Sequence, residues 1–411
     1  MATVAIHNPE SAQLPTTLLI VLTALVAFQP AGTDVYLPSL PAIATEFHVG
    51  PVGVQWTLTV FLVAFSSAQL AAGPIADRFG RRPVILAGQI TFILASVVGA
   101  LSPSLTWLIA ARGAQAIGAC CAVVCARAMI RDLFNPDAGA QVMSRMLGWM
   151  IIVPVFGAAL GGLLQQSWGW RANFVAVATY GAIALASTFH WSKETLPFER
   201  RTSLQPRELW LSASHIIRSP TFRAWLAMAS WSYVGLFAYL SNSSFALIEV
   251  LGLSPTWYGM SFGVTAIGYL IGVLWVRRRI ALFGLRDAPS VGAALAVGCG
   301  LVMAALAALE VRHPAAIMVP MFGFMLAHGI NQPCATSGAI GPFPHCAGTA
   351  AALLGALMAA GAAPMGWLIA ANHDGSTRPL AFGIALCGLG VAASWLLLVR
   401  KLAPEPDLYR L

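Results

Sequence analysis

Two ionisable side chains lie inside long apolar stretches of the sequence, where a charge is costly. Asp34 lies toward the end of the first stretch, and Arg112 lies in the fourth. An ionised group at the centre of a membrane span costs at least ~2.5 kcal/mol by insertion scales, so both residues need an explanation. Desolvation favours the neutral form of a carboxyl group, so Asp34 could exchange protons near neutral pH. A guanidinium stays charged, so Arg112 must face a partner or a water-filled space.

We predict that Asp34 carries proton coupling, although plainer interpretations stay open for it and for Arg112. Asp34 could be hydrated near the outer mouth and cap a broken helix. Backbone carbonyl groups at the end of a span could hold Arg112, and an ion pair between the two is a further arrangement that the sequence leaves open. His328 is an alternative proton carrier because the reference pKa of histidine is near neutrality, but a lone histidine is also typical of hydrogen-bonded packing.

Aromatic, methionine and amide side chains occur in several of the same stretches. Such side chains can line an adaptable pocket for varied small molecules, although each of them is also compatible with ordinary helix packing. The predicted substrate-binding residues are Asp34, Tyr36, Gln115, Met146, Met150, Tyr233, Phe237, Tyr239, Asn242 and His328, with Asn331 and Gln332 as further polar candidates.

The second apolar stretch ends in Gly73-Pro-Ile-Ala-Asp77-Arg78-Phe-Gly80-Arg81-Arg82. Gly73 permits close helix approach, and Gly80 permits a tight turn. Asp77 is a lone carboxylate at the membrane surface, able to pair with an arginine and with the positive end of a neighbouring helix. Such a charge latch could hold a gate closed in one state and release it in another. A later segment that begins at Gly272 resembles this one but has Val276 in place of the acidic residue. We therefore predict that the charge latch is asymmetric, with an acidic residue in the first segment only.

Small residues gather in the fifth apolar stretch, which contains Pro154, Gly157, Gly161 and Gly162. Small residues on one face let two membrane helices approach closely, and a proline weakens the backbone hydrogen-bond ladder. We therefore predict a helix-packing site here, with or without a role in the direction of transport.

Composition places the whole chain in a membrane. Of its 411 residues, 58% are hydrophobic and only 9% are charged, too few to cover a water-exposed surface. Each span needs ~20 mostly apolar residues. We predict twelve spans, at 15–40, 51–73, 83–101, 104–126, 142–165, 172–190, 222–247, 256–276, 290–309, 315–336, 348–371 and 379–399.

The distribution of basic residues predicts the orientation of these spans. If both termini are cytoplasmic, 19 of the 23 lysines and arginines fall on the cytoplasmic side and three on the outer side. This bias is what the positive-inside rule expects. The polar segment 193–220 separates six spans from six, so we predict an N-terminal half over 1–192, a cytoplasmic linker over 193–220 and a C-terminal half over 221–411. Transporters built from repeated halves have this layout.

Several motifs resemble a known transporter group. The segment from Gly73 to Arg82 resembles the GxxxDRxGRR signature of the major facilitator superfamily. Other segments resemble the Bcr/CflA group of drug exporters within it, over about residues 16–400. They are Asp34-Val-Tyr36-Leu-Pro38-Ser-Leu-Pro41, Arg127-Ala-Met-Ile-Arg131-Asp132 and Lys193-Glu194-Thr195-Leu196-Pro197. In the superfamily an RxxQGxG motif is tied to proton coupling, and the matching segment here begins at Arg112, so the resemblance implies this role for Arg112. The chain departs from that motif at Ala116, which replaces its first glycine. It also departs from the GPxxGG motif of exporters at Ala158, which replaces the proline.

The resemblance implies an all-α membrane protein with twelve helices in two pseudo-symmetric halves. It implies a proton-coupled antiporter that exports small drug-like compounds, such as bicyclomycin or chloramphenicol-like antibiotics, by alternating access. Export of an endogenous metabolite, such as an amino acid or a nucleoside, stays open as an alternative. The implied location is the bacterial inner membrane.

An enzyme embedded in the membrane is the least favoured class. The chain contains no GxxxxGK[ST], HExxH or GxSxG motif. Its eight histidines are scattered and its seven cysteines lie in or beside apolar stretches, so no metal site is predicted. We expect no cofactor, since the proton gradient would supply the energy. The expected partners are a small molecule, protons and the lipid bilayer, with no nucleic acid and a monomeric chain.

Overall fold

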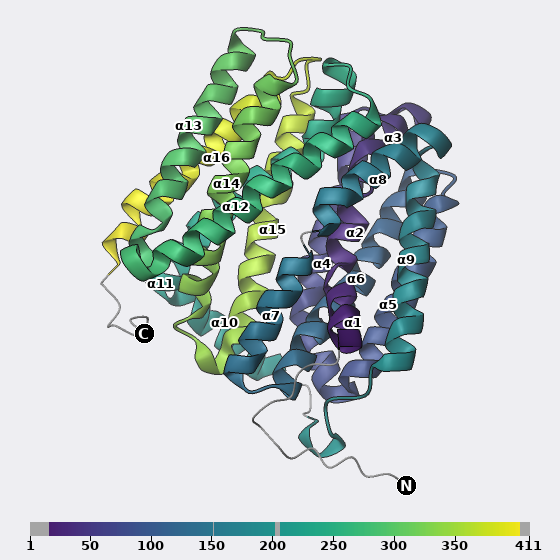
Figure 1. Ribbon diagram of the computed structural model, residues 1–411, viewed down its shortest axis with the longest axis vertical. Coiled ribbons are helices and arrows are strands. Elements are labelled where there is room, and N and C mark those ends of the chain that lie inside the picture. The colour runs from purple at the N-terminus through teal and green to yellow at the C-terminus, as the bar shows by residue number, and fades with distance from the viewer. Residues whose placement is uncertain (1–15, 151, 202–205, 403–411) are drawn as a thin grey trace.

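A computed structural model describes residues 16–150, 152–201 and 206–402. Within these ranges the chain is helical without strands, and the long helices run side by side in one bundle (Figure 1). The first part of the chain forms α1 (Thr16–Val26), α2 (Phe28–Asp34), η1 (Leu37–Ser39), α3 (Leu40–Glu46), α4 (Pro51–Phe79), α5 (Arg81–Ala100), α6 (Leu105–Leu133), α7 (Pro136–Met150), α8 (Ile152–Trp168) and α9 (Trp170–Trp191).

Short helices connect this part to the second set of long helices. The connecting segment contains η2 (Phe198–Arg200) and α10 (Pro206–Arg218). The second set comprises α11 (Pro220–Ser244), η3 (Phe245–Val250), α12 (Pro255–Asp287), α13 (Pro289–Ala308), α14 (Ala315–Ile340), η4 (Pro344–Cys346), α15 (Ala347–Ala371), α16 (Arg378–Leu397) and η5 (Val399–Lys401).

Each predicted span coincides with helical structure. Nine helices of the described ranges are long and apolar enough to cross a membrane, and a bent pair, Thr16–Val26 with Phe28–Glu46, makes a tenth. The two remaining predicted spans correspond to α11 and α14, which are 25 and 26 residues long but carry more polar side chains. This polarity is itself informative, because a polar side chain inside a membrane bundle is retained where it faces partners or a cavity.

Helix boundaries follow from the local sequence. Pro220 and Pro255 each occupy the first turn of a helix, where a missing N–H is not needed. The hydroxyl groups of Ser219 and Ser254 accept hydrogen bonds from backbone N–H groups of these first turns. The turn between α4 and α5 is made by Gly80, whose φ of 100° favours glycine.

The surface of the bundle is apolar where lipid would cover it. Leu94 on α5 is 61% exposed and Ile183 on α9 is 64% exposed, and both helices lie on the right side of Figure 1. On the opposite side, Val302 on α13 and Leu386 on α16 are also exposed. Such extensive apolar exposure would cause aggregation in water, so the bundle is built for a bilayer.

The two sets of long helices meet along two seams. In Figure 1 α1–α9 lie on the right and α11–α16 on the left, with α8 packed on α12 and α4 packed on α15 between them. We call the end of the bundle with the α4–α5 turn and α10 the inner end, because the charge distribution predicts that it is cytoplasmic. The opposite end, where α8 ends and α12 begins, is the outer end.

Backbone atoms come into contact along the α8–α12 seam. A Cβ atom added at Gly162 would overlap the Pro255 carbonyl oxygen, and one added at Gly259 would overlap the Ala158 carbonyl oxygen. The seam therefore depends on glycine, which lets the two helices approach more closely than other residues would allow.

The boundaries of the two halves stay a prediction. The predicted linker, 193–220, contains η2 and α10 in the structure. Residues 1–15 and 403–411 lie outside the described residues, and so do 202–205 within the linker. The predicted cytoplasmic placement of both termini therefore falls on segments that the structure does not describe.

Candidate functional site

Asp34 lies at a break in the first membrane span. The span bends by 45° between Val26 and Phe28, and a second break follows where α2 ends at Asp34. Pro30 and Pro38 flank the residue and interrupt the backbone hydrogen-bond ladder. The Thr33 hydroxyl donates a 2.8 Å hydrogen bond to Asp34 Oδ1, and Asp34 is only 5% exposed. The break therefore puts one carboxyl group into the interior of the bundle.

The surroundings of Asp34 come from both sets of helices. A Cβ atom at Gly157 on α8 would lie 4.0 Å from Asp34 Cβ, and η1, which follows Asp34, packs on α12. Four residues further along α8, Gly161 packs against the backbone of Val35. Asp34 thus sits at the α8–α12 seam, where a change in its charge would act on the contact between the two halves.

Arg112 is fully buried and is held by neutral groups. Its Nη1 donates 2.6 Å hydrogen bonds to the Gly32 carbonyl oxygen and to Gln115 Oε1. The guanidinium carbon lies 4.6 Å from the ring centre of Tyr36 and 4.3 Å from that of Phe61. Two aromatic faces therefore stabilise the cation where a carboxylate would usually do so.

No ion pair joins Asp34 and Arg112 among the described residues. Arg112 Nη2 has no hydrogen-bond partner there either. The two residues are nevertheless linked, because Arg112 bonds to the Gly32 carbonyl group, two positions before Asp34. Any movement of α2 is therefore felt at both residues.

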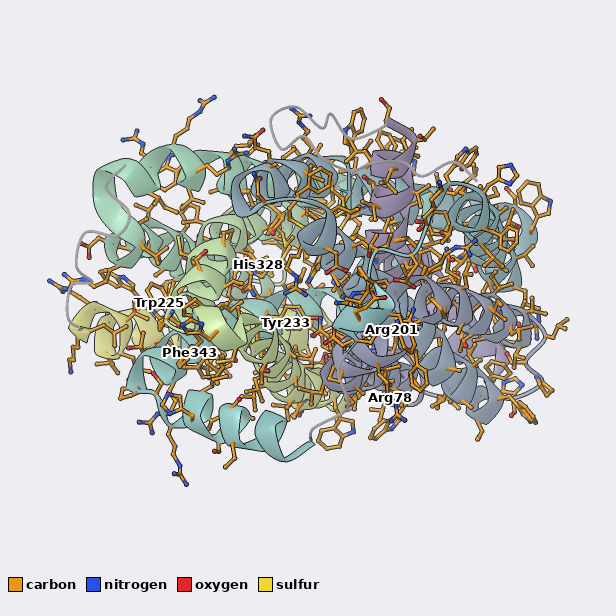
Figure 2. All side chains as sticks on the ribbon, turned by 90° about the horizontal axis from the view of Figure 1, so that it is seen from below. Arg78, Arg201, Trp225, Tyr233, His328 and Phe343 are labelled. Atoms are coloured by element: carbon orange, nitrogen blue, oxygen red, sulfur yellow. The ribbon has the colours of Figure 1, made fainter. Side chains whose placement is uncertain are left out.

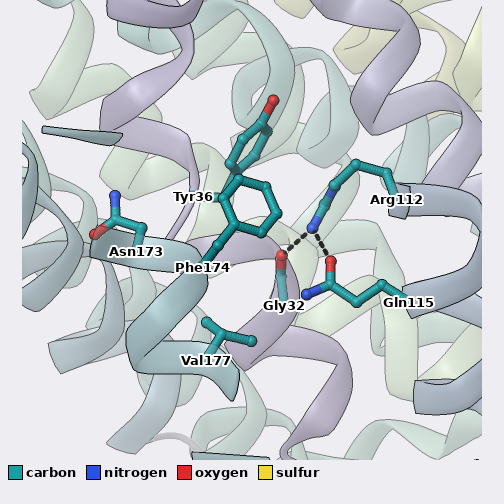
Figure 3. A pocket seen from close by; sticks show the side chains of 7 residues that line it. All are labelled: Gly32, Tyr36, Arg112, Gln115, Asn173, Phe174 and Val177. Atoms are coloured by element: carbon teal, nitrogen blue, oxygen red, sulfur yellow. Dashed lines mark hydrogen bonds between the residues drawn. The ribbon is translucent and has the colours of Figure 1, made fainter. Parts of the chain in front are cut away.

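Tyr36 and Gln115, which we predicted to bind substrate, hold Arg112 in this structure. The Tyr36 hydroxyl shares a 2.8 Å hydrogen bond with Thr57, and Gln115 Nε2 donates to Ser96 Oγ at 2.8 Å. A small cavity borders this cluster (Figure 3). Its lining consists of Gly32, Tyr36, Arg112, Gln115, Asn173, Phe174 and Val177.

Asn173 is a polar residue of this site that the sequence analysis missed. It is 1% exposed, its Nδ2 donates to Ser39 Oγ at 2.7 Å, and its Oδ1 has no partner among the described residues. An asparagine within the sixth apolar span was the available signal. It therefore adds α9 to the elements that build the polar interior of the first half.

The second half contributes neutral polar side chains. His328 on α14 is 4% exposed, and its Nδ1 lies 2.8 Å from the Ser232 hydroxyl on α11. The Tyr269 ring of α12 packs on the imidazole with a centroid distance of 5.5 Å. Tyr233, one residue after Ser232, is partly exposed, and Figure 2 shows it beside His328 near the middle of the bundle, viewed from the inner end.

The remaining predicted substrate residues divide between two places. Phe237, Tyr239 and Asn242 lie on the outer half of α11, where Tyr239 stacks on Phe262 and Asn242 Nδ2 approaches the Gly366 carbonyl oxygen at 3.4 Å. Met146 and Met150 lie on α7 and pack against the core of the first half, Met146 being fully buried. In this structure the predicted substrate residues therefore do not all line one common surface.

The α4–α5 turn, our predicted gate, is surrounded by ionic contacts. Arg81 Nη1 lies 2.6 Å from Asp77, and Arg81 Nε donates to Asp132 of α6 at 3.0 Å. The Glu194 carboxylate accepts hydrogen bonds from the backbone N–H groups of Arg81 at 2.9 Å and Arg82 at 3.1 Å. Glu194 therefore caps the positive end of α5 and ties the start of the linker to the turn.

Other residues of this motif face the surface. Arg82 Nη2 donates to the Phe189 carbonyl oxygen at 2.9 Å, and Arg78 lies over the Phe79 ring. A Cβ atom added at Gly73 would meet nothing within 4 Å, so Gly73 lies in open space here. In the predicted counterpart, Val276 is fully buried and Gly284 has a φ of 72°.

The three helix-packing glycines of α8 all lie near the seam or Asp34. Gly157 approaches Asp34, Gly161 approaches Val35, and Gly162 approaches Pro255, whereas Pro154 is partly exposed. Within the described ranges no three histidine, cysteine or acidic residues are grouped closely enough to hold a metal ion.

Comparison with known proteins agrees with this architecture. The model of the Major Facilitator Superfamily matches residues 22–366. The chain is 31% identical over 389 residues to multidrug resistance protein D of Escherichia coli strain K12, with 94% of this chain and 97% of that protein covered. It is 29% identical over 386 residues to multidrug resistance protein MdtL of Escherichia coli strain SMS-3-5, with 94% and 95% covered.

Solved structures share the fold. A D-xylose–proton symporter has a TM-score of 0.73 and 16% identity, with 94% of this chain and 98% of that chain covered. A bacterial homologue of the human lysosomal transporter Spinster, in an inward-facing and occupied conformation, has a TM-score of 0.72 and 17% identity, with 94% and 97% covered. Together with the family match, which spans most of the sequence, these findings show that the chain belongs to the major facilitator superfamily and is a multi-pass membrane transporter, not an enzyme.

Proposed function

We propose that this chain exports small drug-like compounds in exchange for protons, in a bacterial inner membrane with its inner end toward the cytoplasm. The names of its relatives, multidrug resistance proteins, support the export of drugs. The observation that carries the proton coupling is the burial of Asp34 at the α8–α12 seam, with Thr33 as its hydrogen-bond donor.

The seam gives Asp34 a way to act on the conformation. With the seam closed, an ionised Asp34 would be buried without a cationic partner among the described residues, which is costly. A neutral Asp34 tolerates the closed seam. Proton uptake from the outside therefore favours closure of the outer end, and proton release to the inside favours its opening.

Antiport follows if cargo entry from the inner end promotes that proton release. The loaded transporter then has an ionised Asp34, opens its outer end and loses its cargo there. A proton from outside neutralises Asp34 again and resets the cycle. Arg112 contributes because it is tied to the backbone of the same broken helix at Gly32, so its position follows each movement of Asp34.

The test uses Asp34→Asn in everted membrane vesicles that are energised with a proton gradient. We expect gradient-driven chloramphenicol uptake into the lumen to fall at least about tenfold, because a neutral side chain cannot cycle between protonation states. Asp374→Asn, an exposed acid at the outer end, is the matched control and should transport normally.

Two outcomes would contradict the proposal. One is wild-type transport by Asp34→Asn with equal protein in the membrane. The other is transport by the wild-type protein that a protonophore leaves unchanged, since this would indicate facilitated diffusion. If only an endogenous amino acid or nucleoside drives proton release from the lumen, the cargo is a metabolite and the coupling stands.

A further inference from the structure

Gln55 lies between the two sets of helices near the outer end. It belongs to the second turn of α4, and its side chain is 3% exposed. A Cβ atom added at Gly366 on α15 would lie 2.5 Å from Gln55 Nε2, so the amide group lies against the backbone of α15. Helices α4 and α15 form one of the two seams between the halves (Figure 1). The Gln55 amide therefore crosses this seam.

Side chains of α11 lie around the same point. The Cβ atom added at Gly366 would also lie 3.0 Å from the Phe237 ring and 3.1 Å from Ser241 Oγ. Asn242 Nδ2 donates to Ser241 Oγ at 2.9 Å, and Ser241 Oγ donates to the Phe237 carbonyl oxygen at 2.8 Å. These groups bond to one another within the second half. Gln55 Nε2, in contrast, has no hydrogen-bond partner among the described residues.

A buried amide donor without a partner destabilises the arrangement that buries it. In water the same N–H groups are hydrated, and the hydration lost on burial corresponds to about tenfold or more in an equilibrium constant. Separation of α4 from α15 at the outer end would return water to Gln55, whereas closure removes it. The side chain therefore favours an open outer end, independently of the charge on Asp34.

A second glutamine of α4 lies on the same seam without this cost. A Cβ atom added at Gly355 on α15 would lie 2.7 Å from Gln69 Oε1, so Gln69 also lies against a glycine. Gln69 is partly exposed and nearer the inner end, and neither of its amide atoms is buried without a partner. The two glutamines share a helix, a seam and a type of neighbour, and they differ in the burial of the amide group.

We propose that Gln55 is a positioning residue that opposes closure of the outer end and so keeps the open and closed states close in free energy. This inference rests on the alternating access of the proposed function and adds a residue that sets its balance. A neutral Asp34 permits closure at the α8–α12 seam, while Gln55 opposes closure at the α4–α15 seam. Because the two states are nearly balanced, the loss of one proton from Asp34 is enough to change which of them is populated.

The test measures hydrogen–deuterium exchange of the full chain in lipid nanodiscs without cargo. Gln55→Met keeps the length of the side chain and removes the amide, so we expect closure to be favoured and backbone exchange in the outer-end segments 47–56 and 366–378 to slow about tenfold. Gly366→Ala places a methyl group against the Gln55 amide and should speed exchange in the same segments. Gln69→Met is the matched control and should exchange like the wild-type protein.

Chloramphenicol transport in everted vesicles separates this role from a contact with cargo. Gln55→Met favours the form that receives cargo from the inner end, so both the maximal rate and the KM should fall, the rate about tenfold. Elution of each variant as a single species in detergent shows that a lower rate is not lost folding.

Three outcomes would overturn the proposal. Faster outer-end exchange in Gln55→Met would mean that the amide holds the seam closed, and unchanged exchange would mean that it has no part in the balance. A raised KM would indicate a lost contact with cargo. Because the exchange experiment contains no cargo, a wild-type protein that fails to move chloramphenicol would count against the proposed export function and leave the role of Gln55 standing.

Discussion

Between α4 and α5 the chain turns at Gly80, and the predicted counterpart in the second half turns at Gly284 near the end of α12. Both glycines have positive φ, 100° and 72°. The first turn is enclosed by charged groups, with Glu194 capping α5 and Arg81 between two acids. The second has buried Val276 where the first has Asp77.

The buried side chains of the two halves differ in the same way as the two turns, with charged groups in the first half and neutral groups in the second. The first half buries a carboxyl group, Asp34, and a guanidinium, Arg112. The second half buries His328, Asn331 and Asn242, whose side chains form neutral hydrogen bonds or none among the described residues. One half therefore buries an acidic and a basic side chain, and the other half buries neutral polar side chains.

The largest expected effect separates these two interiors. Arg112→Gln removes the buried charge and its hydrogen bond to the Gly32 carbonyl group, so the helix that carries Asp34 loses a positioning contact and proton-driven transport should fall about 100-fold. His328→Gln keeps a neutral partner for Ser232 and should cost less than about tenfold. Initial transport rates in everted vesicles, corrected for protein amount, measure both. Equal losses for the two variants would remove the distinction between the halves.

The next effect compares the two turning glycines. Both glycines combine a positive φ with an extended ψ, a region essentially restricted to glycine, so alanine should cost about 1–3 kcal/mol at either position. At Gly80 the new Cβ would also lie 2.5 Å from Glu194 Oε2, whereas at Gly284 it would meet nothing within 4 Å. We expect Gly80→Ala to destabilise the protein by about 1 kcal/mol more. Unfolding midpoints in detergent, titrated with a denaturing detergent, provide the comparison.

A smaller effect tests the cap on α5. Glu194→Gln weakens two charge-assisted hydrogen bonds to the backbone of Arg81 and Arg82, so we expect a loss of about 1 kcal/mol in unfolding free energy. Glu199→Gln, an exposed acid five residues later, is the control and should change nothing measurable. Should both variants unfold at the wild-type midpoint, the cap would be structurally unimportant.

The smallest effect concerns the outer ends of the halves. Glu46 bonds to Arg171 at 2.6 Å and to the Trp170 indole at 2.5 Å, whereas Glu310 bonds to Arg378 alone. Exposed ion pairs contribute roughly 0–1 kcal/mol. Glu46→Gln should therefore cost about 0.5 kcal/mol more than Glu310→Gln, and high salt should reduce the difference. The same detergent unfolding assay, run at two salt concentrations, measures it.

Much of this architecture is readable from the sequence because a bilayer imposes simple rules. Length and polarity set the spans, and the cost of intramembrane charge singles out Asp34 and Arg112. The first span was predicted as one stretch, 15–40, although Pro30 and Pro38 were signals for its break. The sequence could not show which way a side chain leaves its helix, so the orientation of Arg112 toward Gly32 required the fold.

Contacts between distant segments were out of reach for a related reason. Glu194 was noticed as part of a motif, but its bond to the backbone of Arg81 joins residues 113 positions apart. Tyr36 and Gln115 were assigned to substrate because their side chains suit that task. In the fold both side chains contact Arg112, since a buried cation without a counter-ion needs hydrogen-bond acceptors and aromatic faces close to it.

The glycine contacts between α8 and α12 have a mechanical consequence. Where two helices interlock through long side chains, those side chains must repack before the crossing angle can change. Helices in direct backbone contact at glycines have few side chains to displace. Parting Gly162 from Pro255 and Gly259 from Ala158 breaks only dispersion contacts at those points. Under the proposed mechanism the α8–α12 seam is therefore inexpensive to open and to close, and the protonation state of Asp34 sets which of the two is favoured.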